Sequence, residues 1–314
     1  MKHTTIIILL LSILSAPAIK ATEADSSSVS HRAAPYVVRI GSSLVINAAL
    51  TEVLKASIHE MRPDRRNNRS WPSQHVSWTA TVGSIVSHEL YQRSPWWVLG
   101  SHAVTGGMMM ERTFSSNHYP KDVLGGLAVG LVSTEIGYFI GRAIFPGSMP
   151  RIPAAVSDFM PAVDVVTTAF FPVGGKNDIS GGTGVSTAVR GTLPMADHWG
   201  VTAALNLSSV PLYENKKYVS MVDGLGFSLG ATGYTDMPGK RFFAEGRALV
   251  GVMRNFHGAG ISRPRCSFTF DVTAGAGCAL TPTLSLGLET GYHYRYLGNV
   301  NSSICLGLFT RASF

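Results

Sequence analysis

The sequence predicts a two-domain α + β protein, in which an all-α helical bundle is followed by an eight-stranded antiparallel β-barrel. Two features predict it. Apolar residues recur at spacings of three and four up to about residue 145, and at every second position from about residue 160, which is a change from a helical to a strand period. Only 14% of the 314 residues are charged, whereas 33 residues are glycine. Such low charge is unusual for a protein surrounded by water on all sides.

Composition also excludes other classes. Beyond the first twenty residues no uninterrupted apolar run exceeds about 18 residues, so a polytopic helical membrane protein is not expected. Hydrophobic residues make up 45% of the chain, which is enough to build a core and argues against disorder. The formal net charge of +7 suits an anionic lipid better than nucleic acid, because basic and aromatic residues do not interleave.

Residues 1–21 are expected to be a secretory signal peptide. Lys2 provides a basic start, residues 6–13 an apolar core, and Ala18 or Ala21 a small residue for cleavage. The alternative, an N-terminal membrane anchor, is disfavoured because the apolar run is short. The chain's 3 cysteines all come late and form neither a disulfide framework nor a metal-ligand spacing, so at most one pair could form.

The helical domain is expected to cover residues 22–152. It would begin with a polar, flexible arm to about residue 34, and its helices would cover about residues 44–61, 75–91, 97–110 and 120–144. Each helix carries a group such as Glu52, Glu89, His102 or Glu135, which would be costly to expose to lipid. The sequence therefore predicts a bundle with polar faces toward water.

The barrel domain is expected to cover residues 153–314. Alternation is clear after Trp199, where Val201, Ala203 and Leu205 share one face and Thr202 lies on the other. Short turns near residues 195–198, 236–239 and 281–282 alternate with longer polar connections over 174–182, 211–220, 255–265 and 297–302. Strands of about ten residues joined in this way are typical of a transmembrane β-barrel. The expected strands cover about residues 163–171, 185–193, 199–208, 225–229, 242–252, 268–274, 284–294 and 304–314.

The polar face of these strands is expected to point into the barrel. It carries charges of both signs, which can satisfy one another where eight strands leave room only for side chains. The final Phe314 and the alternation before it resemble the C-terminal strand of bacterial outer-membrane barrels. The alternative, a soluble barrel or sandwich, would need a polar outer face. The charged residues expected inside are Arg190, Glu245, Arg247, Asp271, Glu289 and Arg311.

Two sequence blocks provide groups that bind anions. Lys55 and Arg62 are seven residues apart, so two helical turns would place both cations on one face, and Pro63 would stop the helix. Two such cations can clamp an oxyanion. The segment from Trp71 to His75 (Trp-Pro-Ser-Gln-His) opens the next expected helix, where backbone N–H groups, a hydroxyl and an imidazole would face an anion.

A third block provides a candidate nucleophile. Arg112, His118 and Asp122 lie around the start of the last expected helix, and Pro120 suits the first turn of that helix. A spacing of four can bring the Asp122 carboxylate against the His118 ring, which would fix the tautomer and raise the nucleophilicity.

Together the three blocks resemble the type 2 phosphatidic acid phosphatase (PAP2) superfamily. The family pattern is Lys-x6-Arg-Pro, then Pro-Ser-Gly-His, then Ser-Arg-x5-His-x3-Asp. This chain matches the spacing throughout and departs from the pattern at two positions, where Gln74 replaces glycine and Glu111 replaces serine.

The resemblance implies a mechanism without a metal or other cofactor. His118 would attack phosphorus to form a phosphohistidine, Asp122 would orient His118, and His75 would protonate the leaving group and later activate water. The oxygens of the transferring phosphoryl group would be bound by Lys55, Arg62, Ser73, Arg112 and backbone amides near Gln74.

The function expected from these observations is hydrolysis of lipid phosphate or pyrophosphate esters at the periplasmic side of the outer membrane. The partners would be an anionic lipid or phosphate-ester substrate and the outer membrane. Two alternatives remain: a nonspecific periplasmic acid phosphatase anchored by the barrel, and a barrel binding protein whose site is inactive because of Gln74 and Glu111. A basic loop containing Arg65, Arg66 and Arg69 would either be solvated or capture an anionic head group.

Overall fold

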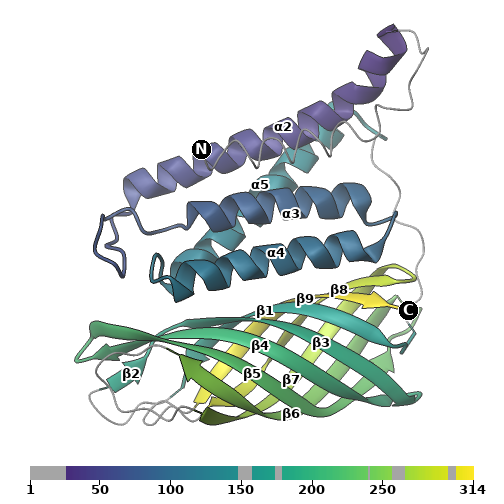
Figure 1. The fold of residues 1–314 in the computed structure, drawn as a ribbon. Coiled ribbons are helices and arrows are strands. Elements are labelled where there is room, and N and C mark those ends of the chain that lie inside the picture. The colour runs from purple at the N-terminus through teal and green to yellow at the C-terminus, as the bar shows by residue number, and fades with distance from the viewer. Residues whose placement is uncertain (1–25, 148–157, 174–178, 240, 257–265, 296–301) are drawn as a thin grey trace.

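The structure, a computed structural model, describes residues 26–147, 158–173, 179–239, 241–256, 266–295 and 302–314. Four helices are followed by strands that close into an eight-stranded antiparallel barrel, so the predicted fold class is confirmed (Figure 1). The expected signal peptide lies outside the described residues. The expected domain boundary at residues 152 and 153 also lies outside them, between the last helix and the first strand, and it stays a prediction.

The helices are α2 (Ser26–Ser57), α3 (Gln74–Leu90), α4 (Pro95–Phe114) and α5 (Pro120–Ile144). Three of them match the predicted helices to within a few residues. The prediction for α2 was wrong at both ends, because the helix begins at Ser26, inside the expected flexible arm, and ends at Ser57 rather than near residue 61. Its end is set by the following loop, in which Glu60 forms a bridge with Arg69.

The eight predicted strands are all present, and each contains more residues than its predicted range. A short extra strand, β2, pairs with the end of β4. The first and last strands of the barrel pair with each other, which closes it. The strands are β1 (Ala162–Pro172), β2 (Ile179–Gly181), β3 (Gly184–Ala196), β4 (Trp199–Glu214), β5 (Lys217–Asp236), β6 (Phe242–Phe256), β7 (Cys266–Thr281), β8 (Leu284–Arg295) and β9 (Ser302–Ser313).

One predicted loop is instead a hairpin. Residues 211–220 were expected to be a longer polar connection, but β4 and β5 continue pairing as far as Glu214 and Lys217. The turn consists of Asn215 and Lys216, whose φ angles are 48° and 64°. Positive φ at both central residues is the geometry of a tight type I′ hairpin turn.

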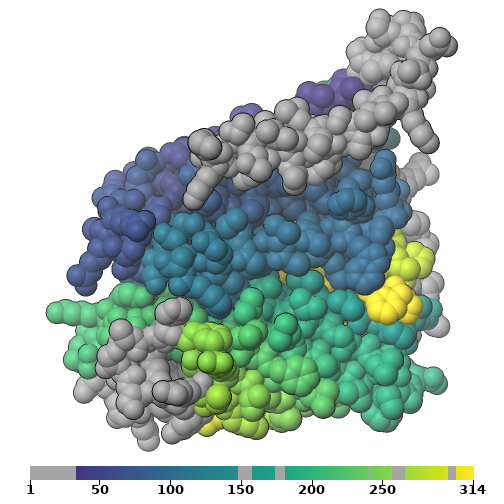
Figure 2. Space-filling view, viewed as in Figure 1, coloured from purple at the N-terminus to yellow at the C-terminus, as the bar shows by residue number. Residues whose placement is uncertain are grey.

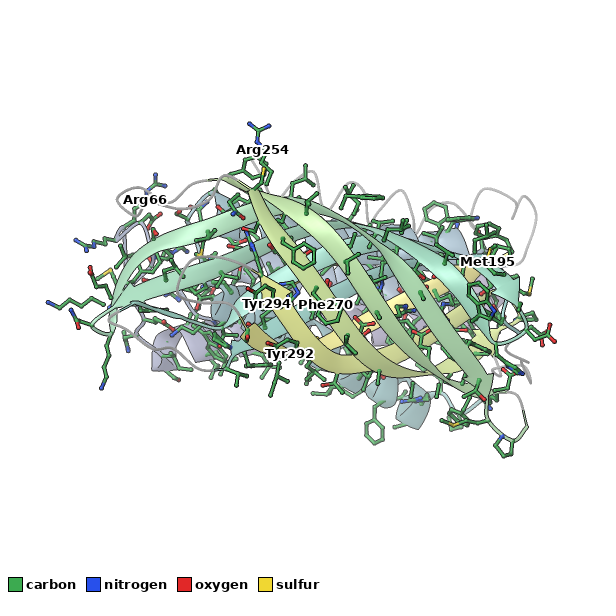
Figure 3. The ribbon with its side chains drawn as sticks, turned by 90° about the horizontal axis from the view of Figure 1, so that it is seen from below. Arg66, Met195, Arg254, Phe270, Tyr292 and Tyr294 are labelled. Atoms are coloured by element: carbon green, nitrogen blue, oxygen red, sulfur yellow. The ribbon has the colours of Figure 1, made fainter. Side chains whose placement is uncertain are left out.

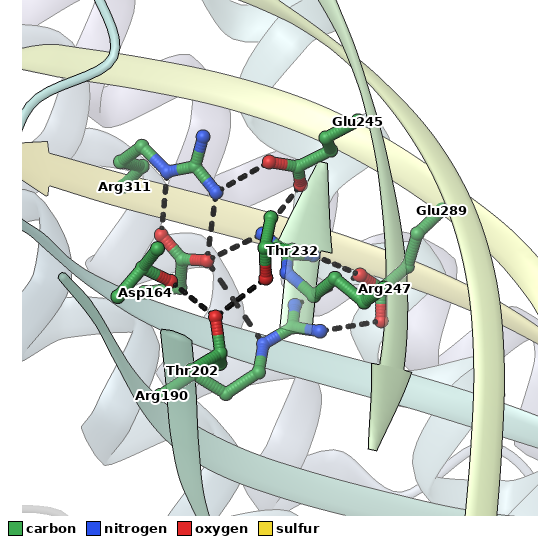
Figure 4. A network of polar contacts seen from close by, with 9 residues as sticks. Asp164, Arg190, Thr202, Thr232, Glu245, Arg247, Glu289 and Arg311 are labelled. Carbon is green, nitrogen blue, oxygen red and sulfur yellow. Dashed lines mark hydrogen bonds and ion pairs between the residues drawn. The ribbon is translucent and has the colours of Figure 1, made fainter. Parts of the chain in front are cut away.

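The barrel interior contains a buried network of charges (Figure 4). Arg311 donates two hydrogen bonds to Asp164, with distances of 2.7 and 3.0 Å, and Arg247 donates to the same carboxylate at 2.9 Å. Arg190 and Arg247 both donate to Glu289. Three arginines and three carboxylates, counting Glu245, thus neutralise one another across the lumen.

The predicted interior set is confirmed, because five of its six members are at most 5% exposed and Asp271 lines the lumen cavity beside Arg190. Within the lumen, the half-buried Asp271 pairs with His293 and not with the arginines. Asp164, which no sequence pattern identified, is the fully buried carboxylate that all three arginines approach. It is placed there by register, because its strand neighbours are Arg190 on β3 and Arg311 on β9.

The helices lie alongside the barrel wall, with α4 nearest to it and α2 farthest away (Figures 1 and 2). The first half of α4 packs Val98 and Leu99 against Val165 of β1 and Ala312 of β9. Its second half packs against Val185 and Thr187 of β3, where a Cβ at Gly106 would lie 2.4 Å from the Thr187 methyl.

Of the four polar residues that were expected to face water, Glu52 and Glu135 are exposed, whereas Glu89 and His102 contact other elements. Glu89 accepts hydrogen bonds from Arg39, at 2.6 and 2.8 Å, and from Tyr138, at 2.6 Å. His102 is hydrogen-bonded to Thr310 of β9, across the contact between the bundle and the barrel. Glu135 is exposed but pairs with His88 at 2.7 Å. The expectation of a polar, water-facing side is therefore confirmed for Glu52 and Glu135 and wrong for Glu89 and His102.

Candidate active site

The three sequence blocks meet at one end of the helical bundle. Lys55 lies in the last turn of α2, Arg62 in the loop between α2 and α3, and Arg112 in the last turn of α4. His118 lies in the turn between α4 and α5, and its backbone N–H donates a hydrogen bond to the Arg112 backbone carbonyl at 3.1 Å. This end is on the left in Figure 1, beside the hairpin of β4 and β5.

His118 and Asp122 form the centre of the site. Their side chains are 1% and 0% exposed, and Nδ1 of His118 lies 3.5 Å from Oδ2 of Asp122. A carboxylate next to Nδ1 favours the tautomer that carries its proton on this nitrogen, which leaves Nε2 with a free lone pair. The pairing predicted from the spacing of four is therefore present, although 3.5 Å is longer than an ordinary hydrogen bond.

Ser70 is a residue of this centre that the sequence patterns did not identify. Its side chain is fully buried, its hydroxyl donates to Oδ2 of Asp122, and it lies 3.5 Å from Nδ1 of His118. The N–H of Tyr119 donates to the same carboxylate oxygen at 2.9 Å. Because 52 residues separate Ser70 from Asp122, no local spacing predicts the contact. The available signal was its place directly before the Trp71–His75 segment.

The charges of Lys55 and Arg62 both reach His118, but the two residues are not on one face of a single helix as predicted. Since α2 ends at Ser57, the two cations do not share a helix face, and the loop brings Arg62 back instead. Lys55 is 5% exposed, and its Nζ donates to the Arg69 carbonyl at 3.0 Å. Burial lowers the pKa of His118, Asp122 opposes this, and the charges of Arg62 and Lys55 lower the pKa further. A neutral imidazole at pH 7 follows.

Buried hydrogen-bond donors from all three blocks are unpaired. Nε of Arg62, Oγ of Ser73 and Nε of Arg112 have no hydrogen-bond partner among the described residues, and one acceptor, Oδ1 of Asp122, is in the same state. Buried polar groups are usually hydrogen-bonded, and these three donors all lie at the end of the bundle that holds His118 and Asp122. A phosphate group would accept from all three.

The start of α3 is tied to the same centre. Ser73 is the N-cap residue, yet its hydroxyl makes no capping hydrogen bond. Its N–H donates to the Asp122 carbonyl at 2.9 Å. This contact depends on Gly126 of α5, because a Cβ there would lie 2.5 Å from the Ser73 carbonyl oxygen. The side chain of His75 is exposed in the first turn of α3, and that of Gln74 is partly buried. The N–H groups of this turn form a site where an anion can bind.

The two departures from the family pattern have different surroundings. Glu111 is 54% exposed, and its carboxylate lies 3.4 Å from Nη1 of Arg112, which reduces the effect of its charge on the site. Gln74 is the first residue of α3 and its carbonyl accepts a hydrogen bond from Ser77 at 3.0 Å. Among the described residues, no three His, Cys, Asp or Glu side chains are grouped as metal ligands would be.

The family comparison agrees with this geometry. The model of the PAP2 superfamily matches residues 36–143, a range that contains all three blocks and the four helices except the first residues of α2 and the last of α5. Residues 36–143 form a PAP2 superfamily domain. The PAP2 domain thus covers the buried His118 and Asp122 as well as the cations around them.

A curated relative matches the PAP2 domain in part. Lipid A 1-phosphatase of Porphyromonas gingivalis is 33% identical over 91 residues, which is 29% of this chain. The match spans 20% of that protein's own length.

Solved structures that are similar to about half of the chain include outer membrane proteins. Neisserial surface protein A is 20% identical, with a TM-score of 0.35, and the matched region is 50% of this chain and 98% of the neisserial chain. OprG from Pseudomonas aeruginosa is 12% identical, with a TM-score of 0.35, and the matched region is 51% of this chain and 96% of OprG. The outer membrane enzyme PagL is 11% identical, with a TM-score of 0.30, and the matched region is 48% of this chain and 99% of PagL.

Proposed function

We propose that the chain is an outer-membrane phosphatase that hydrolyses lipid phosphate or pyrophosphate esters through a phosphohistidine intermediate. The observation that carries the proposal is the buried pair of His118 and Asp122, with Lys55 and Arg62 close enough to lower the pKa of the imidazole. A neutral imidazole whose Nδ1 is held by a carboxylate is an activated nucleophile. Fixed cations around it stabilise the charge on a transferring phosphoryl group.

The reaction proceeds in two displacements. Nε2 of His118 attacks phosphorus while the bond to the leaving oxygen breaks, and His75 protonates that oxygen. Water then attacks the phosphohistidine, His75 takes the proton from this water, and phosphate leaves with His118 restored. Asp122 keeps the ring oriented throughout. The groups that bind the phosphoryl oxygens are Lys55, Arg62, Ser73, Arg112 and the backbone N–H near Gln74.

The charge needed for this chemistry is already present in side chains. Three cations and the start of α3 surround the phosphoryl position, so the reaction is expected to need no metal ion. A chelator should therefore leave the rate within about twofold, which a phosphate-release assay with and without the chelator would check. A large loss that Mg²⁺ or Zn²⁺ restores would contradict the metal-independent part of the proposal.

The outer wall of the barrel supports the membrane location. Its outward side chains are apolar and exposed, such as Phe227 at 53%, Val252 at 61% and Leu288 at 60%, whereas the charged residues are inside. Figure 3 shows Phe270, Tyr292 and Tyr294 on the barrel face that the helices leave open. A closed barrel with an apolar exterior satisfies its backbone in lipid, as a membrane requires.

The lipid substrate is inferred from the location and from the relative. A site held beside a membrane barrel meets lipid head groups at high local concentration. The curated relative is named a lipid A 1-phosphatase, so a phosphorylated glycolipid is the first substrate to test. A periplasmic position for the catalytic domain was expected from its polar residues alone, and it stays a prediction.

Phosphate release from lipid substrates tests the proposal. Purified protein in detergent would be given phosphatidic acid, phosphatidylglycerol phosphate, isoprenoid pyrophosphate and lipid A, beside a soluble phosphomonoester. The proposal expects turnover of at least one lipid and none in His118→Ala, with Ser57→Ala as an active control because Ser57 is exposed and bonds only within its own helix. Full turnover in folded His118→Ala would overturn the mechanism.

The same assay separates the two alternatives. Faster turnover of the soluble ester than of any lipid would favour the nonspecific acid phosphatase. No turnover of any substrate by the wild-type protein would favour the inactive binding protein, and Gln74→Gly would then show whether Gln74 causes the defect.

A further inference from the structure

The helix farthest from the barrel has its polar side inward. In α2, the buried stripe consists of polar residues at every fourth position, and each is at most 5% exposed. The opposite side is apolar and open, with Val37 at 65%, Val45 at 69% and Val53 at 61% exposed. A helix of a water-soluble bundle shows the reverse pattern. The members of the buried stripe are Arg39, Ser43, Asn47, Thr51 and Lys55.

Helix α5 likewise buries mainly small and polar residues and exposes apolar ones. In α5 the buried residues are largely glycine, serine and threonine, whereas Val132, Ile136 and Phe139 are exposed. Glu135 is the charged residue on this exposed side, and it pairs with His88 of α3 at 2.7 Å. Close approach depends on the small residues, since a Cβ at Gly137 would lie 2.2 Å from Oγ of Ser43. Helices held together by small and polar residues, with branched apolar residues outside, are typical of packing in lipid.

The length and hydropathy of α2 and α5 also agree with a position in lipid. Residues 33–57 of α2 and 120–144 of α5 are each long and apolar enough to cross a membrane, yet only 28% and 44% of their most apolar windows are buried. At 1.5 Å per residue, 25 residues span about 37 Å, which exceeds a hydrocarbon core of about 30 Å. A core helix of a soluble protein would be mostly buried.

The bundle also lies where lipid would otherwise contact the barrel. The outward residues Val165, Thr310 and Ala312 are at most 4% exposed because α4 covers them, whereas Val250 and Phe268 on uncovered strands are 50% and 54% exposed. The exposed apolar sides of α2 and α5 therefore continue the apolar band of the barrel wall.

The active-site end of the bundle lies at the barrel end where β6 is joined to β7 and β8 to β9 by the longer connections, and where β4 and β5 form an extended hairpin with a tight turn. Tyr119, next to His118, packs edge-on against Tyr218 of the β4–β5 hairpin, with 5.1 Å between ring centres. At the other end, Trp96 of α4 packs against Phe314, beside the short turns. In Figure 3, Arg66 near the site and Met195 near a short turn lie at opposite ends of the molecule.

We infer that the PAP2 domain is embedded in the outer membrane beside the barrel, and that its site opens toward lipid phosphates of the outward-facing leaflet. Outer-membrane barrels keep short turns in the periplasm and longer loops outside, which sets the direction. This inference rests on the proposed outer-membrane location, and it replaces the expected periplasmic bundle with one that spans the bilayer. Exposed basic residues at the site end, including Arg66 and Lys217, suit an anionic lipid surface.

Site-directed labelling tests both parts of the inference. In a background with Cys266→Ser, Cys278→Ser and Cys305→Ala, single cysteines would replace one residue at a time, and intact cells would be treated with a membrane-impermeant maleimide. The positions are Arg66 beside the site, Lys217 at the hairpin, Asp197 in the β3–β4 turn and Val45 in the middle of α2. All four are exposed, so geometry alone would allow each to react.

The expected result is distinct at each position. Arg66→Cys and Lys217→Cys react in intact cells, whereas Asp197→Cys reacts only after the outer membrane is permeabilised. Val45→Cys reacts at least tenfold more slowly than Arg66→Cys in membranes and reacts fully after denaturation. Only variants that keep heat-modifiable migration of the barrel would be compared, which removes misfolded protein from the test.

Three results would overturn the inference. If Val45→Cys reacts as fast as Arg66→Cys, the bundle lies in water. If Lys217→Cys reacts in intact cells but Arg66→Cys does not, the site does not lie at the outward end. If Asp197→Cys alone reacts, the barrel is reversed. None of these readouts needs turnover, so failure here is distinguishable from failure of the proposed phosphatase activity.

Discussion

Oδ2 of Asp122 receives a hydrogen bond from Ser70, receives another from the Tyr119 N–H and faces Nδ1 of His118. The carboxylate is therefore fixed from two sides before it orients the imidazole. Sequence spacing predicted the pair of His118 and Asp122, because four residues correspond to one turn at the start of a helix. Spacing could not predict Ser70, since its contribution depends on a loop folding back between two helices.

Ser70 is expected to be a positioning residue. Ser70→Ala removes one hydrogen bond to a buried carboxylate, worth about 1.5–3 kcal/mol, so kcat should fall about 10- to 100-fold with little change in KM. Ser70→Thr, which keeps the hydroxyl, should recover part of the rate, whereas Ser57→Ala should be unchanged. Steady-state phosphate release measures all three. An unchanged kcat in Ser70→Ala would show that Asp122 does not need this contact.

The acidic side of the pH profile reports the state of His118. Burial lowers its pKa and Arg62 and Lys55 add to the effect, so the neutral nucleophile persists below the ordinary value of about 6.5. The fall in kcat/KM on the acidic side should then lie below pH 6.5. Two substrates with different phosphate pKa values separate enzyme ionisation from substrate ionisation. A fall centred at pH 7 or above for both substrates would contradict the neutral buried imidazole.

At the scale of elements, strand positions followed from alternation, because inward and outward residues meet different surroundings along every strand. The error at residues 211–220 came from the polar run Glu214 to Lys217, which reads as a loop although Asn215 and Lys216 make a tight turn. Docking of α4 on the barrel was not predictable, since Val98, Leu99 and their strand partners are ordinary apolar residues in the sequence.

Two adjacent glycines of α4 test this docking. A Cβ at Gly106 would lie 2.4 Å from the Thr187 methyl, whereas a Cβ at Gly107 would meet nothing within 4 Å. Gly106→Leu should destabilise the contact by about 1–3 kcal/mol, whereas Gly107→Leu gains the same helix propensity without the clash. The temperature of half-inactivation should fall only in Gly106→Leu. Equal temperatures for the two variants would show that this face of α4 is not against the barrel.

At the scale of the whole molecule, the low charge and abundant glycine of the sequence belong to both domains. The barrel places its charges inside, and the bundle places its polar stripe inside as well. Sequence periodicity shows that a helix face is polar but not whether that face is buried, so the burial of Glu89 and His102 could not be predicted. Contacts such as Arg39 with Glu89, which are 50 residues apart, decide this point.

The charge network in the barrel should hold the fold without taking part in catalysis. Asp164→Asn leaves the buried Arg311 and Arg247 with one carboxylate fewer, and breaking such a pair costs about 3–5 kcal/mol. The temperature at which heat-modifiable migration is lost should fall in Asp164→Asn and stay unchanged in Asp197→Asn, which changes an exposed turn residue. An unchanged temperature in both variants would show that the network is not needed.

Trapping the intermediate shows directly whether His118 of this PAP2 domain carries the phosphoryl group of a lipid. Wild-type protein would be mixed with a ³²P-labelled lipid phosphate, quenched within milliseconds and digested with a protease. Label that is stable to alkali and labile to acid should appear on the peptide that contains His118, and no label should appear in His118→Ala. Turnover of the lipid by the wild-type protein with no labelled peptide, or with label retained in His118→Ala, would contradict a phosphohistidine intermediate at His118.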